Sequence, residues 1–356
     1  MSKLLSTLCA CLCLARPVMA WNAWGHMIVG QIAYNHLDPA VKAKCDALIA
    51  VPVDYAEAKN NTFVTAACWA DDIKNYTSAY DTWHYIDLPI SLDGTTTNGV
   101  VLPSFDVVQA IRQCIATLQS ASASQTDQAT ALRFLLHFVG DIEQPLHCST
   151  AVWASRPQGD SGGNYYYLSG YWTKLHSLWD DGGGYLTNYP SRPLDANGQA
   201  TLNNKVAPIE GDYPYSKSVG SIPDPMDWAL EGQALAQTVA YVGITNNSTP
   251  SAGYLSTVQA TTEQRMVIGG QRLAKLLNTI FMTNAPSATT TSLSSGNFTF
   301  SWSSVSGTTY RVQSKQQLTD ATWTDLTDIT ASTNSTSFSE STTGKQQRFY
   351  RAIVVN

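Results

Sequence analysis

Two histidine–aspartate pairs in the sequence share a spacing of four residues. His137 and Asp141 occur in HFVGD, and His176 and Asp180 occur in HSLWD. Residues four apart lie on one face of a helix, one turn apart, so each pair would present an imidazole beside a carboxylate. Both groups bind zinc and similar metal ions. Each pair therefore indicates part of a metal site, although it can equally be a salt bridge or a helix cap.

Further candidate ligands surround these pairs. His147 follows Pro145 in DIEQPLH, where proline should end a helix and turn the chain back toward the site. His84 precedes YIDLP, and Asp71 opens DDIK. A single histidine among apolar residues is more often a hydrogen-bonded core residue. Two pairs together with three further histidines are hard to obtain from packing alone, and their nitrogen and oxygen donors favour catalytic zinc over a structural site.

The first twenty residues have the composition of a secretion signal. Lys3 precedes an apolar run over residues 4–14, and small residues lead to a cleavage site after Ala20. A membrane-spanning helix needs about 20 apolar residues, and this run is about half as long. Lipid attachment at Cys11 is an alternative that would leave Trp21 inside the chain. We expect residues 1–20 to be a signal peptide that is removed, a secreted protein (extracellular or periplasmic), and Trp21 as its first residue.

The charge balance excludes nucleic-acid binding through a broad basic surface. Loss of the signal removes Lys3 and Arg16, which leaves 19 basic against 27 acidic residues and a net charge of −8. A chain of this charge has no broad surface for phosphates.

The cysteines of the secreted chain leave several disulfide pairings open. Three of the seven lie in the signal, and none of the remaining four forms a close C-x-x-C pair, so a zinc site made of thiolates is not expected. In an exported protein four cysteines predict up to two disulfide bonds, for which three pairings are possible. The four are Cys45, Cys68, Cys114 and Cys148.

Apolar spacing divides the mature chain into two folded parts. Residues 21–283 show mostly helical periodicity, for example in ATALRFLLHFVGDI and TEQRMVIGGQRLAKLLNTIF, and predict a helical domain. Within this part, VWASRPQGDSGGNYYYLSG predicts a short hairpin or an ordered loop. Residues 284–296 are rich in Ser, Thr and Ala and predict a linker. Residues 297–356 alternate apolar and polar side chains between turns, which predicts a small antiparallel sandwich.

The motifs in their order resemble those of one family. W-x-x-x-x-H at the mature terminus, WADDIK, HYID, LLHFVGDIEQPLH, GGN and LHSLWD are similar to those of the single-strand-specific zinc nucleases of fungi and plants, the S-one/P-one family. The resemblance covers about residues 21–283. It implies a mainly α protein whose catalytic domain is helical and like that of the phospholipases C and nucleases, followed here by the added all-β sandwich domain.

The resemblance also implies three Zn²⁺ ions per chain. All nine ligand positions hold the expected residue types, and one aspartate, Asp141, would bridge a close pair of ions. The first ion would be held by Asp71, His84, His137 and Asp141; the second by the α-amine and carbonyl of Trp21 with His26 and Asp141; the third by His147, His176 and Asp180. Signal cleavage then creates a ligand, because an α-amine exists only once the bond before Trp21 is cut.

This metal set suits the hydrolysis of phosphodiesters. Such a reaction needs a nucleophile at moderate pH and positive charge near the transition state, and a cluster of zinc ions supplies both. Asp71 is the expected catalytic residue, which would orient the attacking water or accept its proton. We expect a secreted endonuclease that cleaves single-stranded DNA and RNA to 5′-phosphorylated products and also acts as a 3′-nucleotidase.

Four further positions would contact the substrate according to the resemblance. Tyr85 stands where a phenylalanine is expected, and its ring can stack on a base. Asp87 can accept hydrogen bonds from a base edge. Lys74 and Asn164 fall where a phosphate would lie, although Lys74 can also be read as an exposed helix lysine. Because the chain is acidic, binding should rest on zinc and on stacking with bases that are already unpaired.

Two other functions compete with this hypothesis. A zinc-dependent phospholipase C shares the helical fold and the N-terminal tryptophan ligand. However, His26 lies only five residues after Trp21, where the lipases have a longer gap, and Asp180 stands where they have glutamate. A non-catalytic zinc-binding or adhesion protein would bind the metal and hydrolyse nothing.

The C-terminal sandwich resembles the fibronectin type III-like modules appended to secreted bacterial enzymes. It can bind a glycan, attach the enzyme to a surface, or act as a spacer. Its aromatic residues Trp302, Tyr310 and Trp323 are expected in the core. We expect no obligate protein partner and no membrane association.

Overall fold

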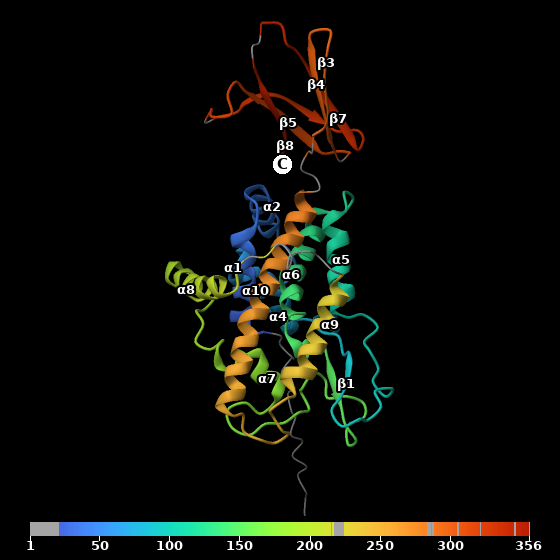
Figure 1. The fold of residues 1–356 in the computed structure, drawn as a ribbon, viewed down its shortest axis with the longest axis vertical. Helices are drawn as coiled ribbons and strands as arrows, with labels where there is room; N and C mark the ends of the chain where they lie inside the picture. The colour runs from blue at the N-terminus through green and yellow to red at the C-terminus, as the bar shows by residue number, and fades with distance from the viewer. Residues whose placement is uncertain are drawn as a thin grey trace, which may run out of the picture.

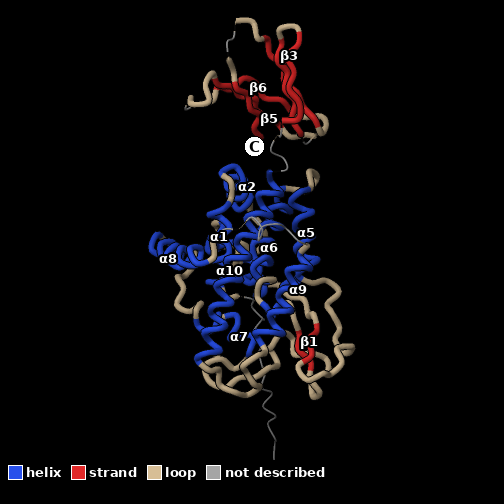
Figure 2. The backbone as a smooth tube through the Cα atoms, in the orientation of Figure 1, coloured by secondary structure: helices blue, strands red, loops and turns tan. Residues whose placement is uncertain are grey.

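The fold was analysed in a computed structural model that describes residues 21–355, apart from residues 215, 217–223, 283–285, 287, 305, 321 and 345–346. The predicted signal peptide, residues 1–20, lies outside the described residues. A helical domain is followed by a small β domain (Figures 1 and 2), which confirms the predicted fold class. No described helix combines the length and apolar character that crossing a membrane requires.

The helical domain carries short 3₁₀ turns and one two-stranded sheet among its helices. Its α-helices are α1 (Ala23–His36), α2 (Pro39–Ile49), α3 (Phe63–Ala66), α4 (Trp69–Asp72), α5 (Val107–Gln119), α6 (Gln125–Asp141), α7 (Leu175–Asp180), α8 (Ala196–Asp212), α9 (Pro225–Leu235) and α10 (Ala252–Met282). Strands β1 (Pro89–Ser91) and β2 (Thr150–Val152) pair in parallel.

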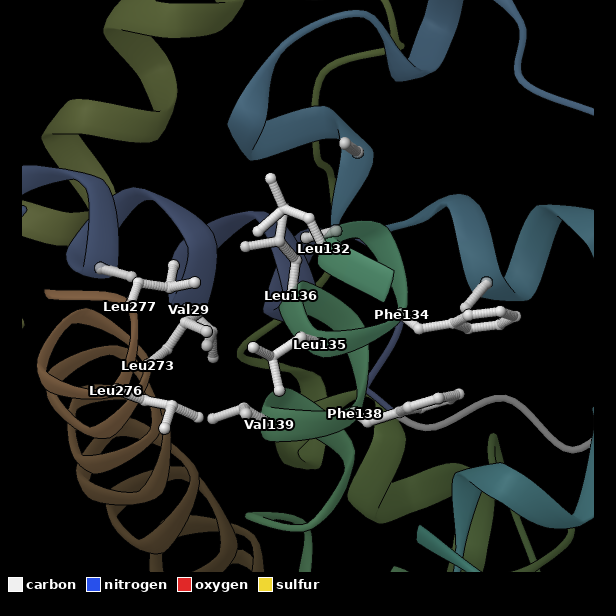
Figure 3. Packing of buried hydrophobic residues seen from close by; sticks show 14 of the residues in the cluster. Val29, Leu132, Phe134, Leu135, Leu136, Phe138, Val139, Leu273, Leu276 and Leu277 are labelled. Carbon is white, nitrogen blue, oxygen red and sulfur yellow. The ribbon is translucent and has the colours of Figure 1, made fainter. Parts of the chain in front are cut away.

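The main core lies where α1, α6 and α10 pack together (Figure 3). Leu135 and Val139 of α6 face Val29 of α1 and Leu273 of α10, and all four side chains are fully or almost fully buried. A truncation such as Leu135→Ala would cost about 2–5 kcal/mol of unfolding free energy, because it leaves a cavity between the three helices. This core holds α1 and α6, which carry metal-ligand candidates, in fixed register.

Local sequence signals set the ends of the key helices. Ser124 caps α6 by accepting a hydrogen bond from the Asp127 amide at 3.0 Å, and the Asp127 carboxylate accepts one from the Ser124 amide. At its other end α6 stops at Asp141, and Pro145 then opens the 3₁₀ turn η4 (Pro145–His147). The amide of Ile86 donates to the His147 carbonyl at 2.8 Å. The proline turn therefore returns to the segment that carries His84, as the sequence predicted.

The disulfide prediction is wrong for this structure. The four cysteines that follow residue 20 are free and buried. They lie at separate places in the core, where a thiol packs as a small apolar group. The Cys68 thiol is 3.4 Å from the Ala23 carbonyl, and the Cys148 thiol is 3.1 Å from the Ile142 carbonyl. Export suggested pairing, but the apolar core accommodates each thiol without a partner.

The β domain consists of two three-stranded antiparallel sheets. Their strand orders are β3-β4-β7 and β6-β5-β8. The strands are β3 (Ala288–Ser294), β4 (Asn297–Ser303), β5 (Thr309–Lys315), β6 (Thr324–Thr330), β7 (Ser335–Ser341) and β8 (Phe349–Val355). Trp302 and Tyr310 are fully buried, as predicted, whereas Trp323 is only partly buried between the Lys315 ammonium and the Arg351 guanidinium.

One strand lies where a linker was expected. Strand β3 falls within residues 284–296 and pairs with β4 from Leu293 opposite Phe298 to Thr291 opposite Phe300. Its Ser and Thr residues suggested a linker by composition, but threonine is β-branched and favours strands. The linker is therefore shorter than predicted, because β3 completes one of the sheets.

Candidate metal centre

Four side chains from three separate elements converge in the middle of the helical domain. Asp71 comes from α4, His84 from the 3₁₀ turn η3 (Asp81–His84), and His137 and Asp141 from successive turns of α6. All four are buried. The His84 Nδ1 atom lies 2.9 Å from Asp141 Oδ2 and 3.1 Å from His137 Nε2. The Asp71 Oδ1 atom lies 3.6 Å from His137 Nε2 and 3.9 Å from His84 Nδ1.

These separations fit one shared metal ion. Zinc–nitrogen and zinc–oxygen bonds are about 2.0–2.2 Å long, so ligand atoms around a tetrahedral zinc lie roughly 3.3–3.6 Å apart. The distances among the four atoms spread around this value, from 2.9 to 3.9 Å. The donor set of two imidazoles and two carboxylates, without sulfur, is also of the type that zinc accepts.

The two oxygens of Asp141 face different histidines. Oδ2 faces His84 and His137, whereas Oδ1 lies 3.3 Å from His26 Nε2 of α1. Neither Asp141 Oδ1 nor His26 Nε2 has a hydrogen-bond partner among the described residues, although both are fully buried. Burying such groups unpaired costs free energy, and a cation between them would satisfy both. The carboxylate therefore has the arrangement of a bridge between two ions.

A glycine on α6 makes room for His26. The His26 ring stacks on the His137 ring with their centres 3.8 Å apart. A Cβ atom added to Gly140 would lie 2.8 Å from His26 Nδ1, which is too close for any side chain other than hydrogen. The glycine of HFVGD thus lets α1 approach α6 closely enough for His26 to reach Asp141.

A second cluster lies where α7 meets the proline turn. The ligand atoms of His147, His176 and Asp180 all lie within 4.8 Å of one another. The His176 Nε2 atom is 3.5 Å from Asp180 Oδ2, and the ring centres of the two histidines are 5.0 Å apart. The His-x-x-x-Asp spacing on α7 places both side chains on one face, as the sequence predicted. The structure therefore brings the three residues predicted for the third ion together.

Backbone carbonyls fix the tautomers of three histidines. Because a carbonyl can only accept, each facing Nδ1 atom must carry the proton and leave Nε2 for a metal. His137 donates to Ala67 at 2.7 Å, His147 to His84 at 2.7 Å, and His176 to Gly162 at 2.6 Å.

Burial keeps several of these imidazoles neutral. It lowers the pKa of His26 to about 3 and that of His84 to about 4, with the nearby His137 and Lys74 charges acting in the same direction. It also lowers the pKa of His147. A neutral imidazole has the lone pair that a metal ion needs. At neutral pH these three rings are therefore ready to act as ligands.

The aspartates differ from one another in their electrostatic surroundings. Burial raises the pKa of Asp71, but the Lys74 ammonium, 2.7 Å from Oδ1, and the nearby histidines outweigh it and hold that pKa below the ordinary value. Histidines have the same effect on Asp141. Burial raises the pKa of Asp180 well above its ordinary value, and the amide of Gln144 opposes this shift by donating to Oδ1 at 2.9 Å.

Trp21 and Asn22, the first residues that the structure describes, lie beside the second cluster. Trp21 is fully buried, and the amide of Asn22 donates to the Asp180 carbonyl at 3.2 Å. The Asn22 side chain donates to the Asp181 carboxylate at 3.0 Å and the Leu186 carbonyl at 2.8 Å, and its oxygen caps α1. The segment that begins at Trp21 is thus fastened to the α7 segment.

The predicted substrate residues lie at the margin of these clusters. Lys74 is not an exposed helix lysine, because its side chain is only 5% exposed and contacts Asp71. Tyr85 and Asp87 are half-buried next to His84, and Asn164 donates its side-chain amide to the Ser161 carbonyl at 2.9 Å. Burial, together with the charge of Asp160, raises the pKa of Asp87 to about 7.

Sequence reasoning missed two residues that support the clusters, and a buried carboxylate elsewhere in the helical domain. Gln144 binds Asp180, Asn22 fastens the N-terminus, and Asp160 is a fully buried carboxylate that accepts hydrogen bonds from the Tyr241 hydroxyl and the Ala151 amide. Gln144 and Asn22 stand next to quoted motif positions, so their proximity in sequence was a usable signal. No pattern in the sequence pointed to Asp160, because its side-chain partner, Tyr241, is 81 residues away along the chain.

Comparison with known proteins gives one consistent family. Residues 21–282 match the family described as S1/P1 Nuclease. Endonuclease 4 of Arabidopsis thaliana is 28% identical over 289 residues, which covers 75% of this chain and 91% of that protein. Nuclease P1 of Penicillium citrinum is 27% identical, covering 73% and 97%. Nuclease S1 of Aspergillus oryzae is 27% identical, covering 79% and 98%.

Among solved structures, the Alpha Toxin from Clostridium Absonum aligns with a TM-score of 0.38 at 9% identity, over 92% of this chain and 87% of the toxin. The family match, by contrast, spans most of the chain and includes every residue of both clusters. The chain therefore belongs to the S1/P1 nuclease family and is a hydrolase of phosphodiester bonds.

Proposed function

We propose that the protein is a secreted, zinc-dependent endonuclease that cleaves single-stranded DNA and RNA to 5′-phosphorylated products and also removes the phosphate of 3′-nucleotides. The observation that carries this proposal is the Asp141 carboxylate, whose two oxygens face two different groups of buried ligands. A carboxylate in this position suits a close pair of metal ions, because each of its oxygens can bind one of them.

The proposed metal set follows the predicted one. Asp71, His84, His137 and Asp141 would hold one Zn²⁺; Trp21, His26 and Asp141 a second; and His147, His176 and Asp180 a third. Bound zinc would supply positive charge for the phosphate and lower the pKa of a water molecule. His26 also lies close to Asp71 and His137, so the first two sites adjoin.

The surrounding side chains have distinct proposed roles. Asp71 orients the attacking water and accepts its proton, and Lys74 holds Asp71 ionised and faces the phosphate. Asn164 lies at the phosphate beside the third site. Tyr85 stacks on a base and Asp87 hydrogen-bonds its edge, which requires a base that is not already paired. The net charge of −8 supports this preference for single strands, because the mature chain lacks the excess of cations needed to grip a duplex backbone.

One assay tests this function against the two alternatives. Mature protein is incubated with denatured DNA, duplex DNA, RNA and phosphatidylcholine, before and after treatment with EDTA and re-addition of zinc. We expect cleavage of the single strands alone, its loss with EDTA and its return with zinc. Cleavage of phosphatidylcholine instead would establish the phospholipase, and zinc-replete protein without any activity would establish the non-catalytic binding protein.

A second measurement tests the proposed N-terminus and secretion. Mass spectrometry of the exported protein should give a chain that begins at Trp21, and metal analysis of the same sample should give three zinc ions. Fully active protein that retains a residue before Trp21 would contradict the proposed second site, since its α-amine would then be an amide.

A further inference from the structure

A cavity of about 590 Å³ lies on the flank of the helical domain where α8 stands beside α1 and α2 (Figure 1). Gln31 and Asn35 of α1 line it, as do Gln199 and Glu210 of α8. Asn35 is nine residues from His26, which places the two on opposite faces of α1. The cavity is therefore separate from the metal clusters, and its volume is typical of a small-molecule site.

Five of the fourteen residues that line this cavity carry side-chain amides, namely Gln31, Asn35, Asn61, Gln199 and Asn203. Four of these amides form one hydrogen-bonded chain in which each amide fixes the next. Gln199 donates to Gln31 at 2.8 Å and to Asn203 at 3.0 Å, Gln31 donates to Asn35 at 2.8 Å, and Asn35 donates to Glu210 at 2.9 Å. The chain links α1 to α8 and holds the amides in defined orientations, which is the preorganisation that a binding site needs.

The fixed amides keep hydrogen-bonding capacity for a ligand. An amide side chain offers two N–H donors and two acceptor lone pairs. Among the described residues, Gln31 and Asn35 each use one N–H donor and one acceptor lone pair in the hydrogen-bonded chain of amides. Each therefore retains one donor and one acceptor position. Groups that donate and accept side by side match a ligand with neighbouring hydroxyls, because each hydroxyl also does both.

The other lining residues narrow the ligand class. The floor is apolar, with Phe63, Val64 and Val206 buried beneath the amides. The charged residues that line the cavity are the acidic Asp46 and Glu210, and none of its described lining residues is a lysine or arginine. The His36 imidazole, which is not part of the lining, contacts Glu210 at 2.8 Å, but the carboxylates that face the cavity repel phosphate groups. The site therefore disfavours nucleotides and suits a neutral ligand with apolar C–H faces and polar edges.

We propose that this amide-lined cavity binds a neutral saccharide of one or two sugar rings. The hydroxyls would pair with Gln31, Asn35 and the carboxylate of Glu210, while the C–H face of the ring would pack on the apolar floor. This is a binding site without a catalytic role, and it is independent of the proposed nuclease activity.

The test uses saturation-transfer NMR on the full mature protein with its metal. The probes are glucose, galactose, mannose, N-acetylglucosamine, maltose and cellobiose, each at millimolar concentration, with 5′-AMP as a competitor. The blocking variant is Asn203→Trp, which fills the cavity from the exposed surface of α8. Its matched control is Asn204→Trp, because Asn204 is an exposed asparagine on the same helix that does not line the cavity.

We expect at least one sugar to bind, with affinity lowered about tenfold or more in Asn203→Trp and unchanged in Asn204→Trp. We expect 5′-AMP to leave the sugar signal unaltered. The proposal is overturned if the protein binds none of the six sugars, if both variants bind equally well, or if 5′-AMP displaces the sugar. None of these outcomes depends on nuclease activity, so failure here is distinguishable from failure of the proposed function.

Discussion

At the scale of single residues, the centre depends on side chains that orient the candidate ligands as well as on the ligands themselves. Gln144 is the clearest case. It is fully buried, donates to Asp180 at 2.9 Å and accepts from the Leu146 amide at 2.6 Å. It therefore couples the proline turn that carries His147 to the aspartate of α7. Partners of this kind typically change metal affinity about 10–100-fold when they are removed.

Replacing Gln144 by leucine should weaken the third site alone. We expect one of three zinc ions to be lost at a chelator concentration about 10–100-fold lower than in the parent protein, with the other two retained. Metal analysis during a chelator titration measures this. Gln128→Leu is the control, because the Gln128 side chain also donates a hydrogen bond, to the Ser120 carbonyl, but lies far along α6 from the clusters. Loss of all three ions together would contradict separate sites.

Gly140 gives a steric test of the same centre. In Gly140→Ala the new Cβ atom would lie 2.8 Å from His26 Nδ1, so His26 must move away from Asp141. A displacement of about 1 Å can cost 10²-fold in rate, so we expect a loss of that order in single-strand cleavage. The control is Gly211→Ala on α8, where no neighbouring atom lies within 4 Å and helix stability should rise by about 0.5–1 kcal/mol. Equal activity of the two variants would show that His26 tolerates the shift.

The buried thiols give a prediction about pH and redox state. Burial raises the pKa of Cys68 and Cys114 to about 12, so at pH 8 the folded protein holds almost no thiolate. We expect no reaction of the native protein with a thiol reagent and reaction of four thiols in denaturant without reductant. Two or no reactive thiols in the denatured protein would show that disulfides form after export.

The same pKa shifts determine the direction of a stability change. Between the unfolded pKa, near 9, and the folded pKa, about 12, the folded state binds more protons than the unfolded state. Because stability falls with pH wherever the folded state holds the extra protons, the free energy of unfolding should decrease above about pH 9, by about 1.4 kcal/mol per pH unit for each thiol. Denaturant unfolding at pH 8 and pH 10 checks this decrease.

At the scale of elements, the N-terminal turn of α1 joins helix capping to the metal centre. Asn22 accepts hydrogen bonds from the amides of Trp24 and Gly25, and it also donates to Asp181 and Leu186. The Asn22 side chain therefore caps the helix that carries His26. It also holds the chain next to Trp21 against the segment that follows α7.

Asn22→Ala should show whether Asn22 supports metal binding in addition to capping α1. We expect a loss of about 1 kcal/mol from the cap and, in addition, loss of the zinc ion proposed at Trp21 and His26. Ser124→Ala is the matched control, because Ser124 caps α6 at the end remote from His137. It should cost similar stability and leave the zinc count unchanged. Unfolding curves and metal analysis on both variants decide the point, and a full zinc count in Asn22→Ala would refute the role in metal binding.

The elements also show where sequence reasoning succeeded and where it failed. Helical spacing placed His137 with Asp141 and His176 with Asp180 on shared faces, because such pairs depend only on local geometry. Strand β3 was missed because its serines and threonines show little alternation of apolar and polar residues. Its backbone hydrogen bonds to β4 stabilise it as a strand, and a local sequence pattern does not reveal such pairing. The buried Asp160 and the amide-lined cavity were missed for a related reason, since each is assembled from segments far apart in the chain.

At the scale of the whole molecule, the acidic charge is unevenly distributed. Residues 288–356 contain five basic and four acidic residues, so the excess of negative charge after residue 20 belongs to the helical domain. This domain also contains the candidate metal centre. Bound zinc would place its positive charge at one point of an otherwise acidic domain, which attracts a phosphate to the centre and discourages binding of the nucleic-acid backbone elsewhere.

This distribution predicts a weak dependence of cleavage on salt. A protein that neutralises 6–10 phosphates loses about 10³–10⁵ in affinity between roughly 50 and 200 mM salt, because counterions compete at each contact. Under the proposed function, Lys74 and the metal ions would meet one or two phosphates, and Tyr85 would contact the base. We expect kcat/KM on a single-stranded oligonucleotide to fall by about tenfold or less over the same range.

A 3′-mononucleotide, which spans only the centre, serves as the control and should show a similar dependence of kcat/KM on salt. A fall of several decades for the oligonucleotide but not for the mononucleotide would mean that an additional cationic surface binds the strand, and the β domain, with its small net positive charge, would then be the place to look for it.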